Sequence, residues 1–208
     1  MKIRALLLPL AVFSLLFITA ISTRSQTVVT FDDLPSSAGG LLITNDYQGL
    51  GWTNFGVVNA VLQTNLHGVN GAGYGMVSPS NVAVNAFGLP AEIDSPSSNF
   101  NFLSTYLTGA WNSNLNVEVQ GFSGATLLYD TTVVASATSP TLFTFDYLNI
   151  NGLAFISSGG QSAGFGGGSG EEFVMDNFTF EFIPEPSSLL LTILGAVTLW
   201  AVVKRKRG

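Results

Sequence analysis

Cysteine is absent from the 208-residue sequence, and histidine occurs once, at His67. The chain therefore forms no disulfide, has no cysteine nucleophile and cannot build a usual zinc site. Basic residues are also scarce and stand only near the two ends, at Lys2, Arg4, Arg24, Lys204, Arg205, Lys206 and Arg207. Residues 25–203 carry none, whereas all 13 acidic residues fall within them.

This distribution makes the central part of the chain purely acidic at neutral pH. Nucleic-acid binding depends on clustered lysine and arginine that displace counterions from phosphates, and arginine forks are common ligands of phosphate groups. We therefore expect no nucleic-acid partner and no arginine-bound phosphate ligand. Apolar residues make up 47% of the chain and charged residues only 10%, against about 25% charged residues in typical soluble domains.

The first 25 residues have the three parts of an export signal. Lys2 and Arg4 are followed by an apolar run over residues 5–21, and small residues stand at Ser22, Thr23 and Ser25. This pattern predicts a Sec-type signal peptide over residues 1–25, cleaved among those small residues. An uncleaved membrane anchor is the alternative.

The last part of the chain, residues 183–208, has a second three-part pattern. Pro184, Glu185 and Pro186 precede an uncharged run over residues 189–203, and four basic residues follow. As a helix this run would span about 23 Å, somewhat less than the ~30 Å hydrocarbon core of a bilayer. The flanking basic residues can reach the interface and cover the shortfall. The pattern predicts a transmembrane helix with a cytoplasmic membrane stop at Lys204, Arg205, Lys206 and Arg207.

A Pro-Glu-Pro triplet, one apolar helix and a basic cluster at the chain end resemble the PEP-CTERM sorting signal of exported bacterial proteins. The resemblance covers residues 183–208. It implies an inner-membrane-anchored precursor, processing by the membrane protease-transpeptidase exosortase, and delivery to the cell surface or extracellular matrix of a Gram-negative-type bacterium. It also implies an association with exopolysaccharide or biofilm matrix. The two prolines keep the triplet extended, which is the form a processing enzyme could grip. A permanent single-pass anchor is the alternative.

Between these ends, residues 26–182 are expected to form one domain of short strands. Runs rich in Val, Phe, Thr and Leu alternate with turn residues, and Leu115, Val117 and Val119 alternate with polar residues. No stretch shows a convincing helical stripe with caps. We expect an all-β fold, an antiparallel sandwich or jelly roll of about ten strands, over residues 27–33, 40–44, 52–60, 81–87, 99–108, 114–122, 126–134, 141–148, 153–157 and 172–182.

The domain contains no catalytic motif in a suitable context. Residues 160–164 match G-x-S-x-G, but a nucleophile elbow needs a helix after it and a histidine downstream. Here FGGGSG follows, and His67 lies upstream. A glycosidase needs two carboxylates at a defined separation. The candidates are Glu92, Glu118, Glu171 and Glu172, and the sequence does not define the distance between any two of them. We assign no catalytic residue.

Asp33 and Asp176 are the candidate metal ligands. Each shares strand parity with apolar neighbours, in VVTFDD and EFVMDNFTFEF, so both are expected to point toward the core or its edge if these strands are regular. A buried carboxylate without lysine or arginine needs N–H donors, a proton or a hard cation, and calcium takes oxygen ligands. The two segments resemble those of jelly-roll carbohydrate-binding modules, which implies a structural Ca²⁺ that ties the first strand to the last. A bulge near Asn177 that turns Asp176 to solvent is the alternative.

Trp52 and Trp111 are the candidate sugar-stacking residues, because both stand in loop-like settings rich in Asn and Gly. A position in the core is the alternative. Together with the export and sorting signals, these residues favour a non-catalytic surface protein that binds or decorates exopolysaccharide. A structural matrix or adhesion protein without a small-molecule site and a glycan-cleaving enzyme are the two other hypotheses.

Overall fold

The computed structural model describes residues 25–183, 195, 197–198, 200 and 202–205. Residues 1–24 of the predicted signal peptide lie outside these residues. So do Pro184, Glu185, Pro186, Lys206, Arg207 and much of the predicted transmembrane segment. Lys204 and Arg205 are described and exposed. Within the described residues, no helix has the length and apolar character that crossing a bilayer requires.

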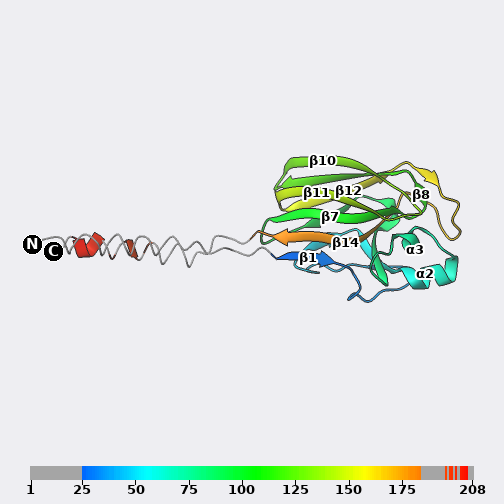
Figure 1. The fold of residues 1–208 in the computed structure, drawn as a ribbon, viewed down its shortest axis with the longest axis horizontal. Helices are drawn as coiled ribbons and strands as arrows, with labels where there is room; N and C mark the ends of the chain where they lie inside the picture. Colours follow the sequence, from blue (N-terminus) through cyan, green and yellow to red (C-terminus); the bar gives the residue numbers. More distant parts are fainter. Residues whose placement is uncertain (1–24, 184–194, 196, 199, 201, 206–208) are drawn as a thin grey trace, which may run out of the picture.

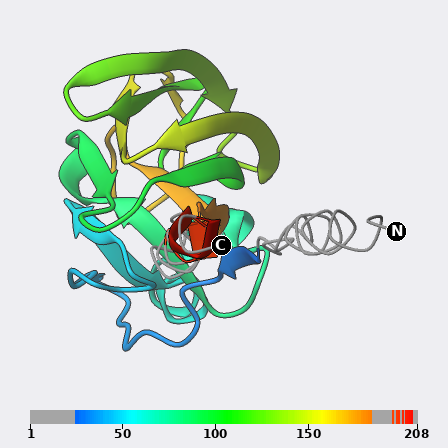
Figure 2. The same cartoon turned by 90° about the vertical axis from the view of Figure 1, so that its left-hand side faces the viewer.

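The body is an antiparallel sandwich of two main sheets (Figures 1 and 2). The larger sheet has seven strands in the order β11-β7-β14-β5-β4-β2, with β1 also paired to β14, and the smaller has five in the order β10-β9-β12-β6-β3. Strands β8 and β13 form a separate pair. The strands are β1 (Gln26–Val29), β2 (Leu41–Leu42), β3 (Gly51–Thr53), β4 (Phe55–Asn59), β5 (Asn81–Asn85), β6 (Ala91–Asp94), β7 (Phe100–Gly109), β8 (Asn112–Ser113), β9 (Leu115–Ser123), β10 (Thr126–Ala135), β11 (Thr141–Ile150), β12 (Gly152–Ser158), β13 (Gln161–Ser162) and β14 (Phe173–Phe182).

The two sheets share one core that is rich in phenylalanine. Phe155 on the smaller sheet contacts Phe55, Phe102 and Phe173 on the larger one, with ring centroids 5.8, 6.1 and 5.8 Å apart. All four side chains are fully buried, and burial of each contributes about 1.5–3 kcal/mol to folding. This core confirms the predicted antiparallel sandwich.

Two of the expected strands are interrupted where the backbone turns. The strand expected at 27–33 ends at Val29, because Phe31 has a positive φ of 63°. The strand expected at 52–60 divides into β3 and β4 at Asn54, where φ is 58°. Strands β6, β8 and β13 were not expected.

Two short helices were also not expected, α2 (Ala60–His67) and α3 (Gly71–Gly75). The Asn59 side chain caps α2 by accepting the Leu62 N–H, and Gly68 ends the helix with φ at 82°. Asn70 caps α3. The sequence therefore does contain the usual capping residues of this short helix, an Asn before its eight residues and a Gly after them.

Both helices pack on the outer face of the larger sheet. A second apolar cluster lies beneath them, formed by Val58, Ala60, Ala72, Val82, Ala110 and Val174. A side chain at Gly71 would overlap the Gly109 carbonyl oxygen, so the close packing of α3 on β7 depends on this glycine. Gln26 pairs with Glu181, and the two ends of the sandwich domain therefore meet at one end of the body, opposite α2 (Figure 1).

Candidate binding site

A pocket of about 570 Å³ lies on the outer face of the larger sheet, beside α2. Its volume falls within the ~300–1,000 Å³ range of small-molecule sites. Outward-facing residues of β4 and β5 form its floor, namely Gly56, Val58 and Val84. Aromatic and polar side chains form the walls, among them Gln63, His67, Asn70, Phe87, Trp111 and Glu172.

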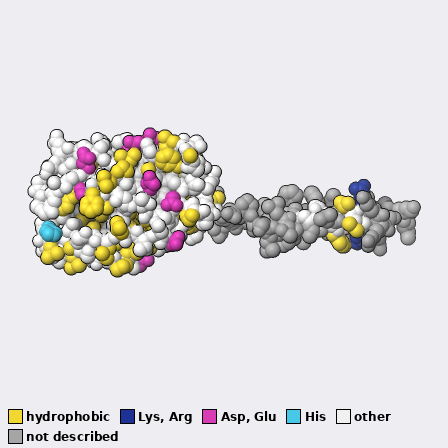
Figure 3. All heavy atoms as spheres, turned by 180° about the vertical axis from the view of Figure 1, so that it is seen from behind, with side chains coloured by type: hydrophobic (Ala, Val, Ile, Leu, Met, Phe, Trp, Pro, Cys, Tyr) yellow, Lys and Arg dark blue, Asp and Glu magenta, His cyan; other side chains and the backbone are white. Residues whose placement is uncertain are grey.

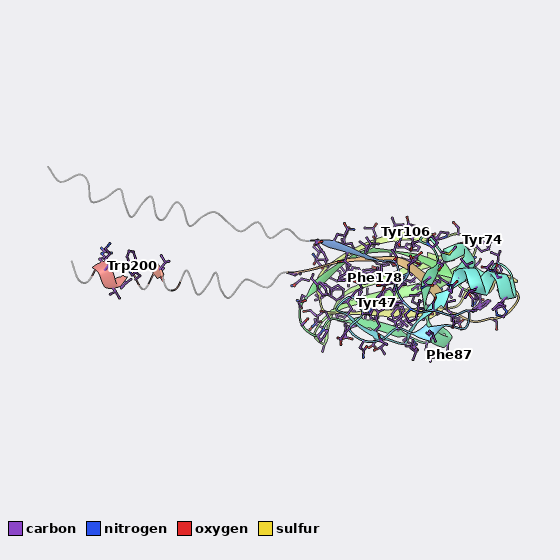
Figure 4. All side chains as sticks on the ribbon, turned by 90° about the horizontal axis from the view of Figure 1, so that it is seen from below. Tyr47, Tyr74, Phe87, Tyr106, Phe178 and Trp200 are labelled. Carbon is purple, nitrogen blue, oxygen red and sulfur yellow. The ribbon has the colours of Figure 1, made fainter. Side chains whose placement is uncertain are left out.

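Phe87 is held beside the pocket in a backbone conformation that phenylalanine rarely adopts. Its φ is 59° and that of Gly88 is 66°, and the Leu89 N–H donates to the Ala86 carbonyl at 3.2 Å. These values define a type I′ turn, whose central positions favour Asn-Gly. The left-handed conformation costs a residue with a Cβ about 1–2 kcal/mol. Nevertheless Phe87 is 87% exposed (Figure 4), so core packing does not account for this residue.

The turn that carries Phe87 is fixed by side-chain amides. Asn54 Nδ2 lies within 3.0–3.3 Å of the carbonyl oxygens of Ala86, Leu89 and Pro90. Asn85 Nδ2 also donates to the Leu89 carbonyl, at 3.1 Å. The exposed phenyl ring is therefore presented from a rigid support.

Trp111 forms part of another wall of the pocket. It is half-buried, because Gly168 lies against its ring so closely that a side chain there would overlap it. The neighbouring Gly167 lies against His67 in α2. The glycine-rich segment after β13 thus packs against the ring of Trp111, which also lines the pocket.

Two polar groups of the pocket wall lack hydrogen-bond partners. Asn70 is 1% exposed; its Oδ1 accepts the N–H groups of Ala72 and Gly73, whereas its Nδ2 has no partner. Glu172 Oε2 is also buried without a partner, against Gly170. An unpaired buried polar group costs about 1–3 kcal/mol. Because both atoms are buried, a ligand reaches them only if these side chains turn toward the pocket, and pairing would then recover part of this cost.

Backbone contacts bring the pocket residues together from distant parts of the sequence. The Ala110 N–H donates to the Glu172 carbonyl at 2.8 Å, and the Gly71 N–H to the Ala110 carbonyl at 3.0 Å. Gly88 packs on the backbone of residues 171–172. Glu172 therefore lies between the turn of Phe87 and the segment of Trp111, with Asn70 nearby. Aromatic faces beside an unpaired donor and acceptor form an arrangement suited to binding.

Trp52 lies in the core and not at the pocket. It is 4% exposed, makes edge-on ring contacts with Phe31, Phe55 and Phe178, and donates its Nε1–H to the Tyr47 carbonyl at 3.0 Å. The expectation that Trp52 stacks on sugar is therefore wrong. Of the two tryptophans, the structure leaves Trp111 as a candidate.

Asp176 is completely buried, but on the outer face of the larger sheet. The register of β14 shifts after Asp176, and Asn177 has a φ of 52°, so Asp176 faces away from Phe178. The bulge that the sequence allowed is present, but the carboxylate lies under residues 77–78 and not in solvent. The expectation that the Asp176 side chain points in the same direction as Phe178 is therefore wrong.

Hydrogen-bond donors surround the Asp176 carboxylate. Oδ2 accepts the Val77 and Ser78 N–H groups at 2.7 and 2.8 Å, and Oδ1 accepts the Ser78 hydroxyl and the Asn177 N–H at 3.0 and 2.7 Å. Burial raises the pKa of Asp176 from 3.8 to about 6, although these hydrogen bonds oppose the rise. Both oxygens are thus engaged by donors, and the residue does not fit a calcium ligand.

Asp33 is exposed and accepts a hydrogen bond from the Tyr47 hydroxyl at 2.6 Å. No hydrogen bond joins it to Asp176. Among the described residues, no three Asp, Glu or His side chains are grouped so that they could hold a metal ion. The structure does not support a calcium site at Asp33 and Asp176, although β1 and β14 are paired as first and last strands.

No family model matches this sequence, and no curated protein matches it either. Solved structures show remote similarity. A DUF4465 family protein from Bacteroides caccae has 13% identity and a TM-score of 0.49, over 81% of this chain and 97% of that one. A DUF4465 family protein from Bacteroides ovatus has 9% identity and a TM-score of 0.46, over 76% and 99%. TmCBM61 in complex with beta-1,4-galactotriose has 8% identity and a TM-score of 0.34, over 70% and 99%.

Proposed function

We propose that this chain is an exported, non-catalytic surface protein whose pocket between Phe87 and Trp111 binds a glycan of the extracellular matrix. The observation that carries the proposal is Phe87, an exposed aromatic ring held in an unfavourable conformation at the edge of a pocket. Functional sites are where such strain is usually retained.

The chemistry of the wall suits a sugar. Aromatic rings pack on the apolar faces of sugar rings, and amide and carboxylate groups pair with hydroxyls. The absence of lysine and arginine from residues 25–203 disfavours phosphate-bearing ligands. Glu172 is the one carboxylate among the residues that line the pocket, whereas hydrolysis of a glycosidic bond usually uses two. Binding without cleavage is therefore the better interpretation.

The sorting signal at Pro184, Glu185 and Pro186 belongs to the same proposal. Residues 26 and 181 are paired, so segments before and after the sandwich join it at one end. Helix α2, which lines the pocket, lies at the other end (Figure 1). A membrane anchor on the first end would leave this part of the body distant from the membrane, accessible to matrix polysaccharide.

A structural role in the matrix is the second candidate. Strands β10 and β11 are the outer strands of their sheets, and they expose leucines at 127, 128, 142 and 148. Edge strands with apolar side chains are sites of association between chains. This role and glycan binding are compatible, since they use different surfaces.

Replacing Phe87 with asparagine is expected to weaken glycan binding and to stabilise the fold. Asn-Gly is the preferred pair of a type I′ turn, so the free energy of unfolding should rise by about 1 kcal/mol. Loss of the aromatic face should weaken binding roughly tenfold, which corresponds to about 1.4 kcal/mol. A glycan array of neutral and amino-sugar oligosaccharides, calorimetry with the best binder and urea denaturation measure both effects.

Gln48 provides a matched control. Gln48 and Gly49 have φ values of 56° and 77°, and the Leu50 N–H donates to the Tyr47 carbonyl at 3.2 Å, so they occupy the same turn type outside the pocket. Gln48→Asn should stabilise the fold without changing affinity. Equal affinities of wild type and Phe87→Asn would contradict the proposal.

Replacing Pro184, Glu185 and Pro186 together with alanine is expected to block processing of the exported precursor. Alanine favours helix where the prolines forbid it, so the extended segment would be lost. Immunoblots of membrane and extracellular fractions should show the variant accumulating in the membrane, while a variant with Ser187 and Ser188 replaced by alanine is processed. Normal release of the triple variant would refute the sorting assignment.

A further inference from the structure

The surface that a ligand approaches carries charge of one sign. Residues 25–183 contain 12 acidic side chains, that is all 13 except Glu185, and no lysine or arginine. One face of the body accordingly shows acidic side chains and no basic ones (Figure 3). Such a field attracts cationic ligands and repels anionic ones.

Within the pocket, the acidic group is Glu172. Its neighbour Glu171 is exposed and accepts the Gly159 N–H at 2.6 Å, so Glu171 has a structural partner. Glu172 Oε2 has none and is buried. Two adjacent glutamates thus differ in role, and the unpaired one lies between the turn of Phe87 and the segment of Trp111.

A hydroxyl group can donate a hydrogen bond to this carboxylate but leaves its negative charge uncompensated. A protonated amine donates a hydrogen bond and also carries the opposite charge, so Coulomb attraction adds to the hydrogen bond. Aromatic rings add to the attraction, because the faces of tryptophan and phenylalanine attract ammonium groups. A carboxylate-bearing sugar would be repelled by Glu172 and by the body as a whole.

We infer that the pocket selects glycans that carry a protonated amine, such as de-N-acetylated amino sugars, and that Glu172 is the residue that recognises the amine. The inference rests on the proposed glycan-binding function and names its ligand class.

The test compares two probes on the full chain, a glucosamine trimer and the N-acetylglucosamine trimer of the same linkage. Calorimetry should give the wild type a roughly tenfold preference for the amine form, corresponding to about 1.4 kcal/mol, and this preference should decrease with added salt. Glu172→Gln should bring the ratio of the two affinities close to one. Glu171→Gln removes the same charge from the adjacent position and should keep the ratio.

The outcomes separate this inference from the proposed function. Equal affinities of the wild type for the two trimers would overturn the inference and leave glycan binding in place. Equal loss of the preference in both variants would assign it to the overall charge and overturn the role of Glu172. No affinity for either trimer or for any oligosaccharide of the array would remove the proposed function, and the inference with it.

Discussion

Replacing Trp52 with alanine is expected to lower the free energy of unfolding by about 3–5 kcal/mol, the usual cost of removing a large aromatic side chain from a core. The ring is 4% exposed and contacts Phe31, Phe55 and Phe178 edge-on. Its removal also leaves the Tyr47 carbonyl without the Nε1–H donor. Urea denaturation followed by circular dichroism measures the loss. The fraction that remains folded should bind glycan normally.

Trp111 provides the matched comparison, because it is the other tryptophan of the sandwich domain. Trp111→Ala should cost much less stability, since the ring is half-buried, and should reduce glycan binding at least tenfold. The two substitutions are chemically the same and should have opposite consequences. A stable Trp52→Ala variant that has lost binding would show that Trp52 belongs to the site and not to the core.

Replacing Asp176 with alanine is expected to destabilise the fold by about 3 kcal/mol. The carboxylate accepts hydrogen bonds from Val77, Ser78 and Asn177, and hydrogen bonds to charged groups contribute about 1.5–3 kcal/mol each. Val77 is 37% exposed, so water replaces part of what is lost. The measurement is again urea denaturation. Ser78→Ala is the control: it removes one of the four bonds and should cost about 1 kcal/mol.

The same carboxylate makes stability depend on pH. Burial raises its pKa from 3.8 to about 6, so the folded chain binds this proton more tightly than the unfolded chain. The resulting stability is present below pH 4 and is lost as the pH rises through about 6, by up to about 3 kcal/mol at ~1.4 kcal/mol per pKa unit. Asp176→Asn should flatten this decrease between pH 4 and 6. An unchanged pH profile in this variant would assign the decrease to other acidic groups.

The fold was largely predictable from the sequence because its strands carry period-two patterns. Leu115, Val117 and Val119 are all fully buried, as their alternation indicated. Strand boundaries were less predictable where single residues reverse the backbone. Phe31 and Asn54 adopt positive φ values, which hydrophobic periodicity does not encode. For Phe31 the residue type itself argues against this conformation.

The pocket was less predictable, because local signals in the sequence were weak or were assigned to strands. Asn59 and Gly68 bracket α2 with the usual capping residues, but the helix has only eight residues. Asn70, Phe87 and Glu172 are brought together by contacts between strands that are distant in sequence. A Phe-Gly pair after a strand can signal a turn, but the sequence does not show that the ring stays exposed.

The errors at Trp52 and Asp33 have related causes. Both residues stand near turns, and in turns the side-chain direction is set by tertiary contacts and not by spacing. Trp52 lies in β3, a strand of only three residues, so the sequence offers too short a pattern to show which way its side chain points. Asp33 lies beyond the end of β1, so strand parity does not apply to it.

A crystal structure of the chain grown with the glucosamine trimer should show a sugar ring between Phe87 and Trp111, with its amine nitrogen about 2.8 Å from the Glu172 carboxylate. A trimer bound at another surface, or a pocket without sugar density at saturating concentration, would contradict this expectation.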